Sequence, residues 1–357
     1  MPKSRAAPRL LDVAEAAGVS LATASRSLSG QSGVSEAVAQ RVRGVAQSLG
    51  YVANVHARTL AGGLTSMIGL IVHEIDDPYF SEIASGVVHA ATSHQRLVQI
   101  SHSGRDPEQE LRQIRALIAS RVDAIIIAGS GYTDPTAQQE SRLLLARYAD
   151  SGGRVAVIGR HELAVDAVLP ANKEAGAAIA EHLISLGHRR IAIAAGTEGL
   201  TTVEDRLTGL ADGFGQAHPP VTATAVRSDF TREGGRLAAE QIISDHPEVT
   251  AIIALNDAMA IGVLAALRSH RIAVPDQMSV VGFDDVSVAE ALAPSLTTVR
   301  LPMATMGQLA LEMTLKPPAA EPRRKATSHQ LMVRDSTAAP RSLGEETPLL
   351  RDNERNV

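Results

Sequence analysis

Residues 17–26 read AGVSLATASR, and this stretch decides how the N-terminal part of the chain folds. Gly18 can turn the chain sharply between two helices, and Ser20 can cap the N-terminus of the second one. The stretch therefore predicts a helix-turn-helix unit, whose second helix enters the DNA major groove with its N-terminal part. Three side chains would then lie near base edges, namely Leu21, Ala22 and Arg26. Helical pairs of this size also occur in proteins that never touch DNA, so the rest of the chain has to decide.

The flanking sequence extends this unit to a small bundle. Apolar residues recur at helical spacing from Leu10 to Ala17, from Leu21 to Leu28, and again after Ser35 until Gly50 ends the pattern. Three short helices with one apolar face each predict a helical DNA-binding domain over residues 1–50. The next residues, 51–65, contain a Gly-Gly pair and indicate a hinge.

Composition sets the broad class of the protein. The chain has 357 residues, of which 45% are hydrophobic, so it can bury a substantial core in two or three domains. It has no cysteine, which excludes disulfides and thiolate metal sites and favours a reducing compartment. No apolar run of 18 residues occurs, so we expect neither secretion nor membrane spanning, and a cytoplasmic location.

Charge is distributed unevenly along the chain. Residues 1–60 hold seven cationic and three anionic side chains, a net of +4, which leaves −9 for the rest of a chain whose total is −5. A small basic module on an acidic body suits a protein that contacts phosphate with one end only. An unevenly charged, solvated surface is the plain alternative.

Several short motifs resemble the DNA-binding headpiece of the lac repressor and galactose repressor family, at matching spacings. They are Asp12-Val13-Ala14, Ala17-Gly18-Val19-Ser20, Ala22-Thr23, Ser25-Arg26, Val34-Ser35, Leu49-Gly50-Tyr51, Asn54, Ala57-Arg58 and Leu60. The chain departs from the family pattern at Arg9 (usually Thr), Ala24 and Ser27 (valines), Ser29 (Asn) and Ala53 (Pro). These departures make the small core less bulky and remove a rigid residue at the start of the hinge. We therefore expect this headpiece alone to be less stable than most headpieces of the family.

The remaining chain alternates between buried strands and amphipathic helices, which predicts parallel, doubly wound sheets. The first strands are expected at Met67–Val72, Leu97–Ile100, Ala124–Ala128 and Val155–Ile158, with a helix from Ser81. The rhythm restarts at Asn172 and includes a helix beginning near Arg206, so residues 66–337 form an α/β body of two lobes. This is similar to the family's body, which resembles periplasmic sugar-binding proteins. Residues 338–357 are expected to be a disordered tail.

The headpiece offers phosphate contacts and base contacts. Hydroxyl and amide side chains such as Thr23, Ser25 and Asn54 can bond phosphate oxygens, which positions the protein without specifying sequence. Arg26 can bond a guanine edge at two points, worth roughly 1–3 kcal/mol of discrimination, while Leu21 and Ala22 suit a thymine methyl. The alternative for Arg26 is a solvated surface arginine. The candidate DNA-binding residues are Ser20, Leu21, Ala22, Thr23, Ser25, Arg26, Asn54, Arg58 and Leu60.

The resemblance gives Leu60 a specific role. In the family, one such leucine from each subunit wedges into a central minor-groove step and kinks the duplex. This role needs two subunits on a near-palindromic operator, and so implies a homodimer. The plain alternative packs Leu60 against the body.

Candidate ligand residues follow strands of the predicted sheets, where open α/β sheets bind ligands. The first such loop contains Asp77, Tyr79 and Phe80. The chain has only eight aromatic residues, so two adjacent ones in this loop indicate a stacking role. An arginine, an amide and carboxylates converging at strand ends can bond vicinal hydroxyls. By resemblance, Arg206, Phe230, Asn256 and Asp284 match family ligand contacts, and Arg160 is a weaker candidate of the same kind. Asp257 and Asp285 can instead cap the following helix or turn.

Other chemistries fit less well. No His-x-x-x-His spacing accompanies the carboxylates, so no metal site is expected, and Gly129-Ser130-Gly131 lacks the third glycine of a dinucleotide loop. No serine lies in a nucleophile-elbow pattern. The remaining alternatives are a transport-type sugar-binding protein and an enzyme acting on a sugar.

The sequence therefore predicts a DNA-binding transcription regulator, a repressor, that is not an enzyme and needs no cofactor. Its partners are double-stranded operator DNA, a second copy of the chain and a small effector, a sugar, with no membrane partner. The effector can change DNA affinity only as far as it prefers one arrangement of the lobes.

Overall fold

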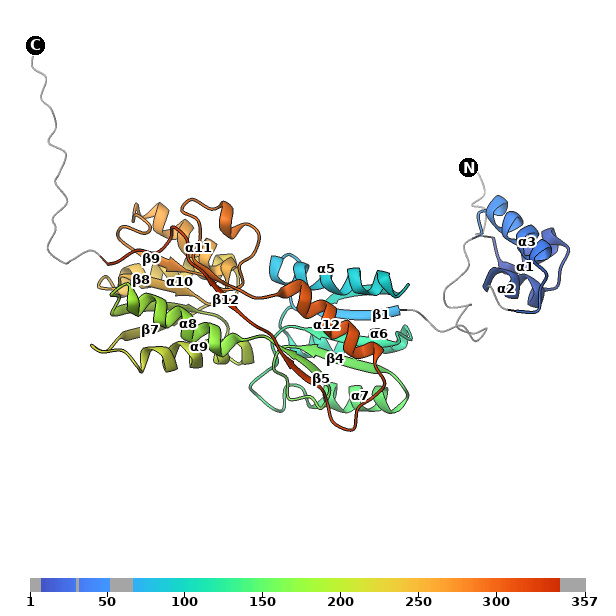
Figure 1. Ribbon diagram of the computed structural model, residues 1–357, viewed down its shortest axis with the longest axis horizontal. Helices are drawn as coiled ribbons and strands as arrows, with labels where there is room; N and C mark the ends of the chain where they lie inside the picture. The colour runs from blue at the N-terminus through green and yellow to red at the C-terminus, as the bar shows by residue number, and fades with distance from the viewer. Residues whose placement is uncertain (1–7, 30–31, 52–66, 341–357) are drawn as a thin grey trace, which may run out of the picture. The chain divides into compact units, whose positions relative to one another are not determined.

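The computed structural model describes residues 8–29, 32–51 and 67–340. These residues form a small helical unit and a large α/β body (Figure 1). The predicted contacts Asn54, Arg58 and Leu60, most of the predicted hinge and tail residues 341–357 lie outside the described residues. No described helix is long and apolar enough to cross a membrane.

The helical unit contains the three predicted helices. They are α1 (Leu10–Ala17), α2 (Leu21–Ser29) and α3 (Glu36–Leu49). Gly18 ends α1 with φ 63°, a left-handed conformation that glycine adopts without strain. The core is small and rich in alanine: Val13, Ala14, Ala17, Ala24, Val42 and Ala46. Ser27 is also buried, and its hydroxyl donates to the Thr23 carbonyl at 2.8 Å, so this polar group in the core is satisfied.

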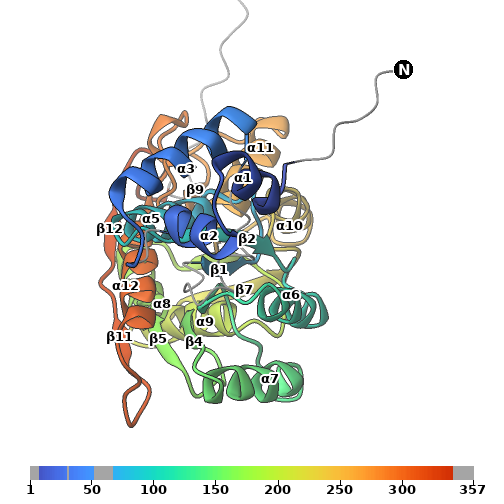
Figure 2. The ribbon, with the colours of Figure 1, turned by 90° about the vertical axis from the view of Figure 1, so that its right-hand side faces the viewer.

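The N-terminal lobe of the body is built on one six-stranded sheet, in the order β11-β5-β4-β3-β1-β2, where β11 is Arg324–Ala326. Before the chain first passes to the other lobe, it forms β1 (Met67–Val72), α5 (Pro78–Ser93), β2 (Leu97–His102), α6 (Pro107–Ala119), β3 (Ala124–Ala128), α7 (Gln139–Asp150), β4 (Arg154–Ile158) and β5 (Asp166–Leu169). Figure 2 shows α5 and α12 (Met303–Leu315) on one side of the sheet and α6 and α7 on the other. Gly86 and Gly307 let α5 and α12 approach closely, because a Cβ at either would clash with backbone of the other helix.

The C-terminal lobe has a four-stranded parallel sheet in the order β7-β6-β8-β9. Its elements are α8 (Asn172–Ser185), β6 (Arg190–Ala195), α9 (Thr201–Phe214), β7 (Thr222–Arg227), α10 (Arg232–Asp245), β8 (Ala251–Ala254), α11 (Asp257–Ser269) and β9 (Ser279–Val281). The central strand β8 is buried along its whole length, as its run of Ala and Ile predicts. The predicted fold class, a helical headpiece with a two-lobed α/β body, is confirmed.

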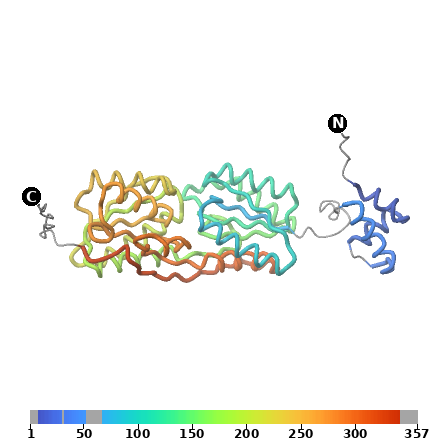
Figure 3. Tube along the Cα trace, turned by 90° about the horizontal axis from the view of Figure 1, so that it is seen from above, coloured from blue at the N-terminus to red at the C-terminus, as the bar shows by residue number. Residues whose placement is uncertain are grey.

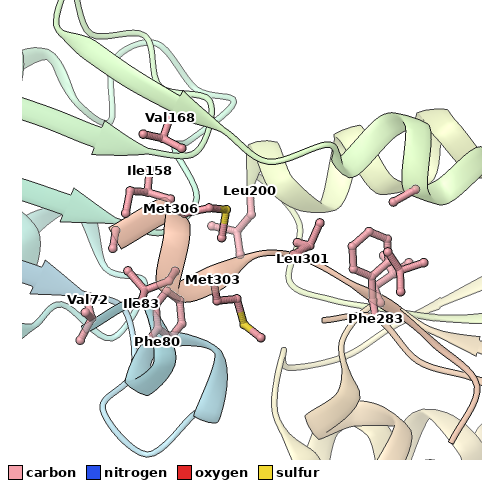
Figure 4. Close-up of a cluster of buried hydrophobic side chains, with 14 of the residues drawn as sticks. Val72, Phe80, Ile83, Ile158, Val168, Leu200, Phe283, Leu301, Met303 and Met306 are labelled. Atoms are coloured by element: carbon pink, nitrogen blue, oxygen red, sulfur yellow. The ribbon is translucent and has the colours of Figure 1, made fainter. Parts of the chain in front are cut away.

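The chain crosses between the lobes three times. After β5 it enters the C-terminal lobe, and after the short helix η1 (Ala289–Ala291) and strand β10 (Thr298–Arg300) it returns as α12 and β11 (Arg324–Ala326). It then crosses again through β12 (Gln330–Met332), which pairs with β10. Figure 3 shows this C-terminal segment, in red, running along both lobes. Figure 4 shows Met303 beside Phe80 and Ile83, with Leu301 further toward Phe283, so one apolar core continues through the crossings.

Several boundaries differ from the predicted ones. α5 begins at Pro78 rather than Ser81, because Asp77 caps it by accepting from the Tyr79 amide at 3.0 Å and proline suits the first helical position. α9 begins before Arg206, at Thr201. The body also continues past residue 337, because Ala338 bonds to the C-terminal lobe through both its amide and its carbonyl.

Candidate functional site

Helix α2 presents the predicted reading face to solvent. Leu21 is 49% exposed, although it is a large apolar residue, and Ala22 and Arg26 are exposed beside it. The opposite face carries buried Ala24 and Ser27. Ser20 caps the helix as predicted, because its hydroxyl accepts from the Thr23 amide at 3.1 Å. The N-terminal part of α2 is therefore both fixed and accessible.

The body brings seven of the eight predicted ligand residues around one cavity between its lobes. The cavity measures about 30 Å³, room for one or two water molecules. The seven are Asp77, Tyr79, Phe80, Arg206, Phe230, Asn256 and Asp284, and the wall also includes His73, Arg105, Gly129, Ser130, Leu200 and Thr202. Side chains from both lobes thus converge at the carboxyl ends of the strands.

Arg206 is the central cation of this site and is only 2% exposed. Its guanidinium donates to Asp284 at 2.8 Å, to Asn172 at 3.0 Å and to the Leu255 carbonyl. It also stacks on the Phe283 ring, 3.7 Å from the centroid. Three of the five N–H groups of the guanidinium are therefore bonded within the C-terminal lobe.

Asp284 is held in an unusual backbone conformation. Its φ is 114°, in a region that residues with a side chain rarely adopt, and such strain is typical of functional sites. Burial raises the pKa of the Asp284 carboxyl, and the Arg206 guanidinium opposes that rise. Burial likewise raises the pKa of Tyr79, and the nearby Asp284 charge acts in the same direction. Tyr79 therefore faces the cavity as a neutral hydroxyl.

Three polar residues near the ends of the C-terminal-lobe strands make hydrogen bonds or ion pairs that stabilise the lobe itself. Asn256 lines the cavity and also caps α11, because its carbonyl oxygen accepts from the Met259 amide at 2.8 Å. For Asp257 and Asp285 the alternative role was a cap of the helix or turn that follows each of them, but α11 is capped by Asn256 and η1 has no side-chain cap. Asp257 accepts from the Thr298 hydroxyl at 2.7 Å, and Asp285 pairs with Arg300 and Arg334 at 2.6 and 2.7 Å. They tie the crossing strands to the C-terminal lobe.

A buried polar chain lies behind the N-terminal wall of the cavity. His161 Nε2 is 3.1 Å from the Gly129 carbonyl, which can only accept, so this nitrogen carries the proton. His161 Nδ1 then accepts from Gln138 Nε2 at 3.3 Å, and the same Nε2 donates to Glu110 at 3.0 Å. Burial raises the pKa of Glu110 to about 7, and burial lowers that of His161 to about 4. The chain connects a buried acid to the cavity wall.

Arg160 does not line the cavity, although its sequence position after β4 suggested that it would. Its side chain is 44% exposed and pairs with Asp205 of α9 at 2.7 Å. The surrounding loops also join the lobes: Tyr132 and Leu200 form an antiparallel bridge, and the Thr133 amide donates to the Gly199 carbonyl at 2.8 Å. Arg160 therefore closes one edge of the cleft.

Two charged or titratable wall residues were missed by the sequence interpretation. His73 follows β1 and packs against Gly129, and burial lowers its pKa well below the usual value. Arg105 pairs with Glu74 at 3.2 Å and Asp77 at 3.7 Å. Neither belongs to a local motif; only its position after a strand could have suggested it. Within the described ranges, no group of three His, Cys, Asp or Glu could hold a metal ion.

Comparisons with known proteins agree with both parts of the structure. Residues 9–54 match the model of the bacterial regulatory proteins, lacI family, and residues 180–337 match the periplasmic binding protein-like domain. The HTH-type transcriptional regulator DegA of Bacillus subtilis (strain 168) is 33% identical over 301 residues, which cover 84% of this chain and 88% of DegA. The chain belongs to the LacI family. The resemblance found in the sequence is thus confirmed.

Two solved structures of transcription regulators extend the likeness over nearly the whole chain. The lac repressor dimer bound to operator and the anti-inducer ONPF is 25% identical with a TM-score of 0.79, covering 94% of this chain and 100% of that one. The CelR–cellobiose complex is 28% identical with a TM-score of 0.68, covering 92% and 99%. This LacI-family protein is a helix-turn-helix transcription regulator, not an enzyme, and a transport role is not favoured.

Proposed function

We propose that this LacI-family regulator binds a near-palindromic operator as a homodimer and that a sugar bound between its lobes controls that binding. The observation that carries the proposal is the convergence of seven of the predicted ligand residues on one cavity. The paired Arg206 and Asp284 offer donors and acceptors for vicinal hydroxyls, and the Phe230 ring offers a stacking face. A relative of this fold forms a complex with cellobiose, which supports the same ligand class.

The headpiece residues take the roles that their exposure allows. Leu21, Ala22 and Arg26 face the base edges, and Ser20, Thr23 and Ser25 lie at the phosphate side of α2. Asn54 contacts a DNA phosphate, Arg58 is a further DNA contact, and Leu60 is the minor-groove wedge that the family resemblance implies. Specificity is thus divided between α2 and the hinge.

Exposed apolar surface on the body supports the homodimer. In the N-terminal lobe, Val88 of α5 and Leu97 and Ile100 of β2 are exposed. In the C-terminal lobe, a groove of about 720 Å³ is lined by Ile261, Leu264, Ile272, Val274 and Leu292, with Leu237 exposed on α10. Large exposed apolar patches mark interfaces in soluble proteins.

The cavity size determines how a ligand can enter. At about 30 Å³ it is far below the roughly 300–1,000 Å³ of ordinary ligand pockets, so the lobes must part before a sugar ring can bind. The free energy by which the ligand prefers the parted or the closed arrangement is then the most it can contribute to the change in operator affinity.

The test uses the full chain. Operators are selected from random duplex DNA, and retardation is measured with and without a panel of sugars, with light scattering to give the mass of the free protein. We expect a palindromic consensus, a dimer mass and at least one sugar that changes the operator Kd. A monomer, or a Kd unaffected by every sugar, contradicts the corresponding part of the proposal.

Replacing Arg26 by alanine tests direct readout by α2. Because the exposed guanidinium is the one strong polar base reader of this face, we expect Arg26→Ala to relax the preference at one base pair in each half-site by about 1–3 kcal/mol. Retardation on single-base operator variants measures this preference. An unchanged preference at every position removes Arg26 from base readout.

A further inference from the structure

The cleft between the lobes contains two chambers. The inner chamber is the cavity of about 30 Å³ described above, and a larger outer chamber of about 380 Å³ lies beside it. Both lobes contribute to the outer chamber, with Glu74 and Asp76 on one side and Ala258, Ile261 and Val286 on the other. The outer chamber alone has room for a sugar ring.

A side-chain partition separates the chambers. Asp77, Arg105 and Phe230 line both of them. The Arg105 guanidinium lies 5.5 Å from the centroid of the Phe230 ring, and its side chain is only 10% exposed. The guanidinium and the ring therefore form part of the wall that the two chambers share.

The other edge of the cleft is closed. There the Thr201 amide donates to the Gly131 carbonyl at 3.0 Å and the Thr202 amide to the Ser130 hydroxyl at 3.0 Å, beside the Tyr132–Leu200 bridge. The Arg160–Asp205 pair, described above, spans the same edge. A ligand longer than one ring can therefore extend only past Arg105, into the outer chamber.

The lining of the outer chamber selects a neutral polar ring. Its floor is apolar, formed by Phe230, Ala258, Ile261 and Val286, which suits the C–H face of a sugar. Its rim carries three carboxylates and two arginines, and Arg105 is already paired with two of those carboxylates. An anionic ligand such as a sugar phosphate meets net negative charge here, whereas hydroxyls find acceptors.

We propose that the outer chamber binds the second ring of a neutral disaccharide whose first ring occupies the inner chamber once the lobes have parted. The inference rests on the proposed sugar-controlled function and narrows its ligand class. The first ring contacts Arg206 and Asp284, and the link between the rings passes Phe230 where the Arg105 guanidinium now lies.

The experiment compares disaccharides with their own components on the full chain. Cellobiose, maltose, lactose, melibiose, trehalose and sucrose are screened by thermal shift beside glucose, galactose, fructose and glucose 6-phosphate, and Kd values follow by calorimetry. Ala258→Phe then fills the outer chamber from the first turn of α11. Ala211→Phe, an exposed position of α9 that lines neither chamber, is the matched control.

We expect at least one disaccharide to bind more tightly than its component sugars, and Ala258→Phe to weaken it tenfold or more while Ala211→Phe does not. Ala258→Leu replaces the phenylalanine variant if that one does not fold. Tighter binding of a monosaccharide or of glucose 6-phosphate, or a disaccharide affinity unaffected by the filled chamber, overturns the inference and leaves the sugar-controlled function standing. No binding by any sugar overturns both.

Discussion

Replacing Arg206 by alanine is expected to lower the free energy of unfolding of the body by about 3–5 kcal/mol. The variant leaves the buried Asp284 carboxyl without the guanidinium that lies 2.8 Å away, and removing one partner of a buried ion pair leaves an uncompensated charge. It also frees the Leu255 carbonyl and the Asn172 side chain, which lose their donor. Urea unfolding of the full chain measures the change.

Arg160 provides the matched control. Its ion pair with Asp205 is exposed, so Arg160→Ala should cost about 1 kcal/mol or less. The double variant Arg206→Ala/Asp284→Ala should recover part of the stability that Arg206→Ala loses, because no charge is left buried alone. A loss below about 1 kcal/mol for Arg206→Ala, or the absence of recovery in the double variant, contradicts this account of the site.

The second large effect concerns pH. The pKa of Glu110 is raised from 4.5 to about 7 by burial, so the folded state binds a proton that the unfolded state has released. The contribution of Glu110 to the free energy of unfolding is fully present below pH 4.5. It is lost as the pH rises through about 7, and the total loss is roughly 3 kcal/mol. Glu110→Gln keeps an acceptor for Gln138 and cannot ionise. At pH 8 the variant should therefore be the more stable protein, whereas near pH 4.5 the two should be similar.

Denaturant unfolding of both proteins between pH 4.5 and 8.5 measures the difference. Asp257 has a pKa raised to about 7 by burial and contributes a slope of the same sign, but it is present in both proteins and cancels. A parallel pH dependence in the two proteins would show that Glu110 is ionised throughout that range in the folded state.

Much of the fold was predictable because its strands and helices carry strong local patterns. The buried strand Ala124–Ala128 matches its prediction, and so does helix Leu10–Ala17, where Gly18 ends the apolar period. Strand β11 was not predicted, because all three of its side chains are exposed and it exists only through pairing with β5. The start of α5 was placed late, since its cap, Asp77, lay within the loop expected to bind the ligand.

The sequence predicts those site residues whose position is determined by the end of a strand. A position after a strand places the backbone near the cleft, as it does for Asp284, whereas Arg206 lies within α9 and was predicted from the family resemblance. Such a position does not fix the partner of a long side chain, so Arg160, also after a strand, pairs with Asp205 across the cleft edge instead. His73 and Arg105 contact residues far away in sequence, Tyr132 and Glu74 respectively, and no local motif indicated them.

The late return of the chain to the N-terminal lobe has a consequence for synthesis. That lobe is discontinuous in sequence: its last helix and edge strand, α12 and β11, come after the whole sheet of the C-terminal lobe. A ribosome releases the chain from the N-terminus, so one face of α5 and the edge at β5 stay uncovered until residue 326 has left the exit tunnel. The lobe encoded first is therefore completed last, and a nascent chain spends most of its translation with that apolar face open to chaperones.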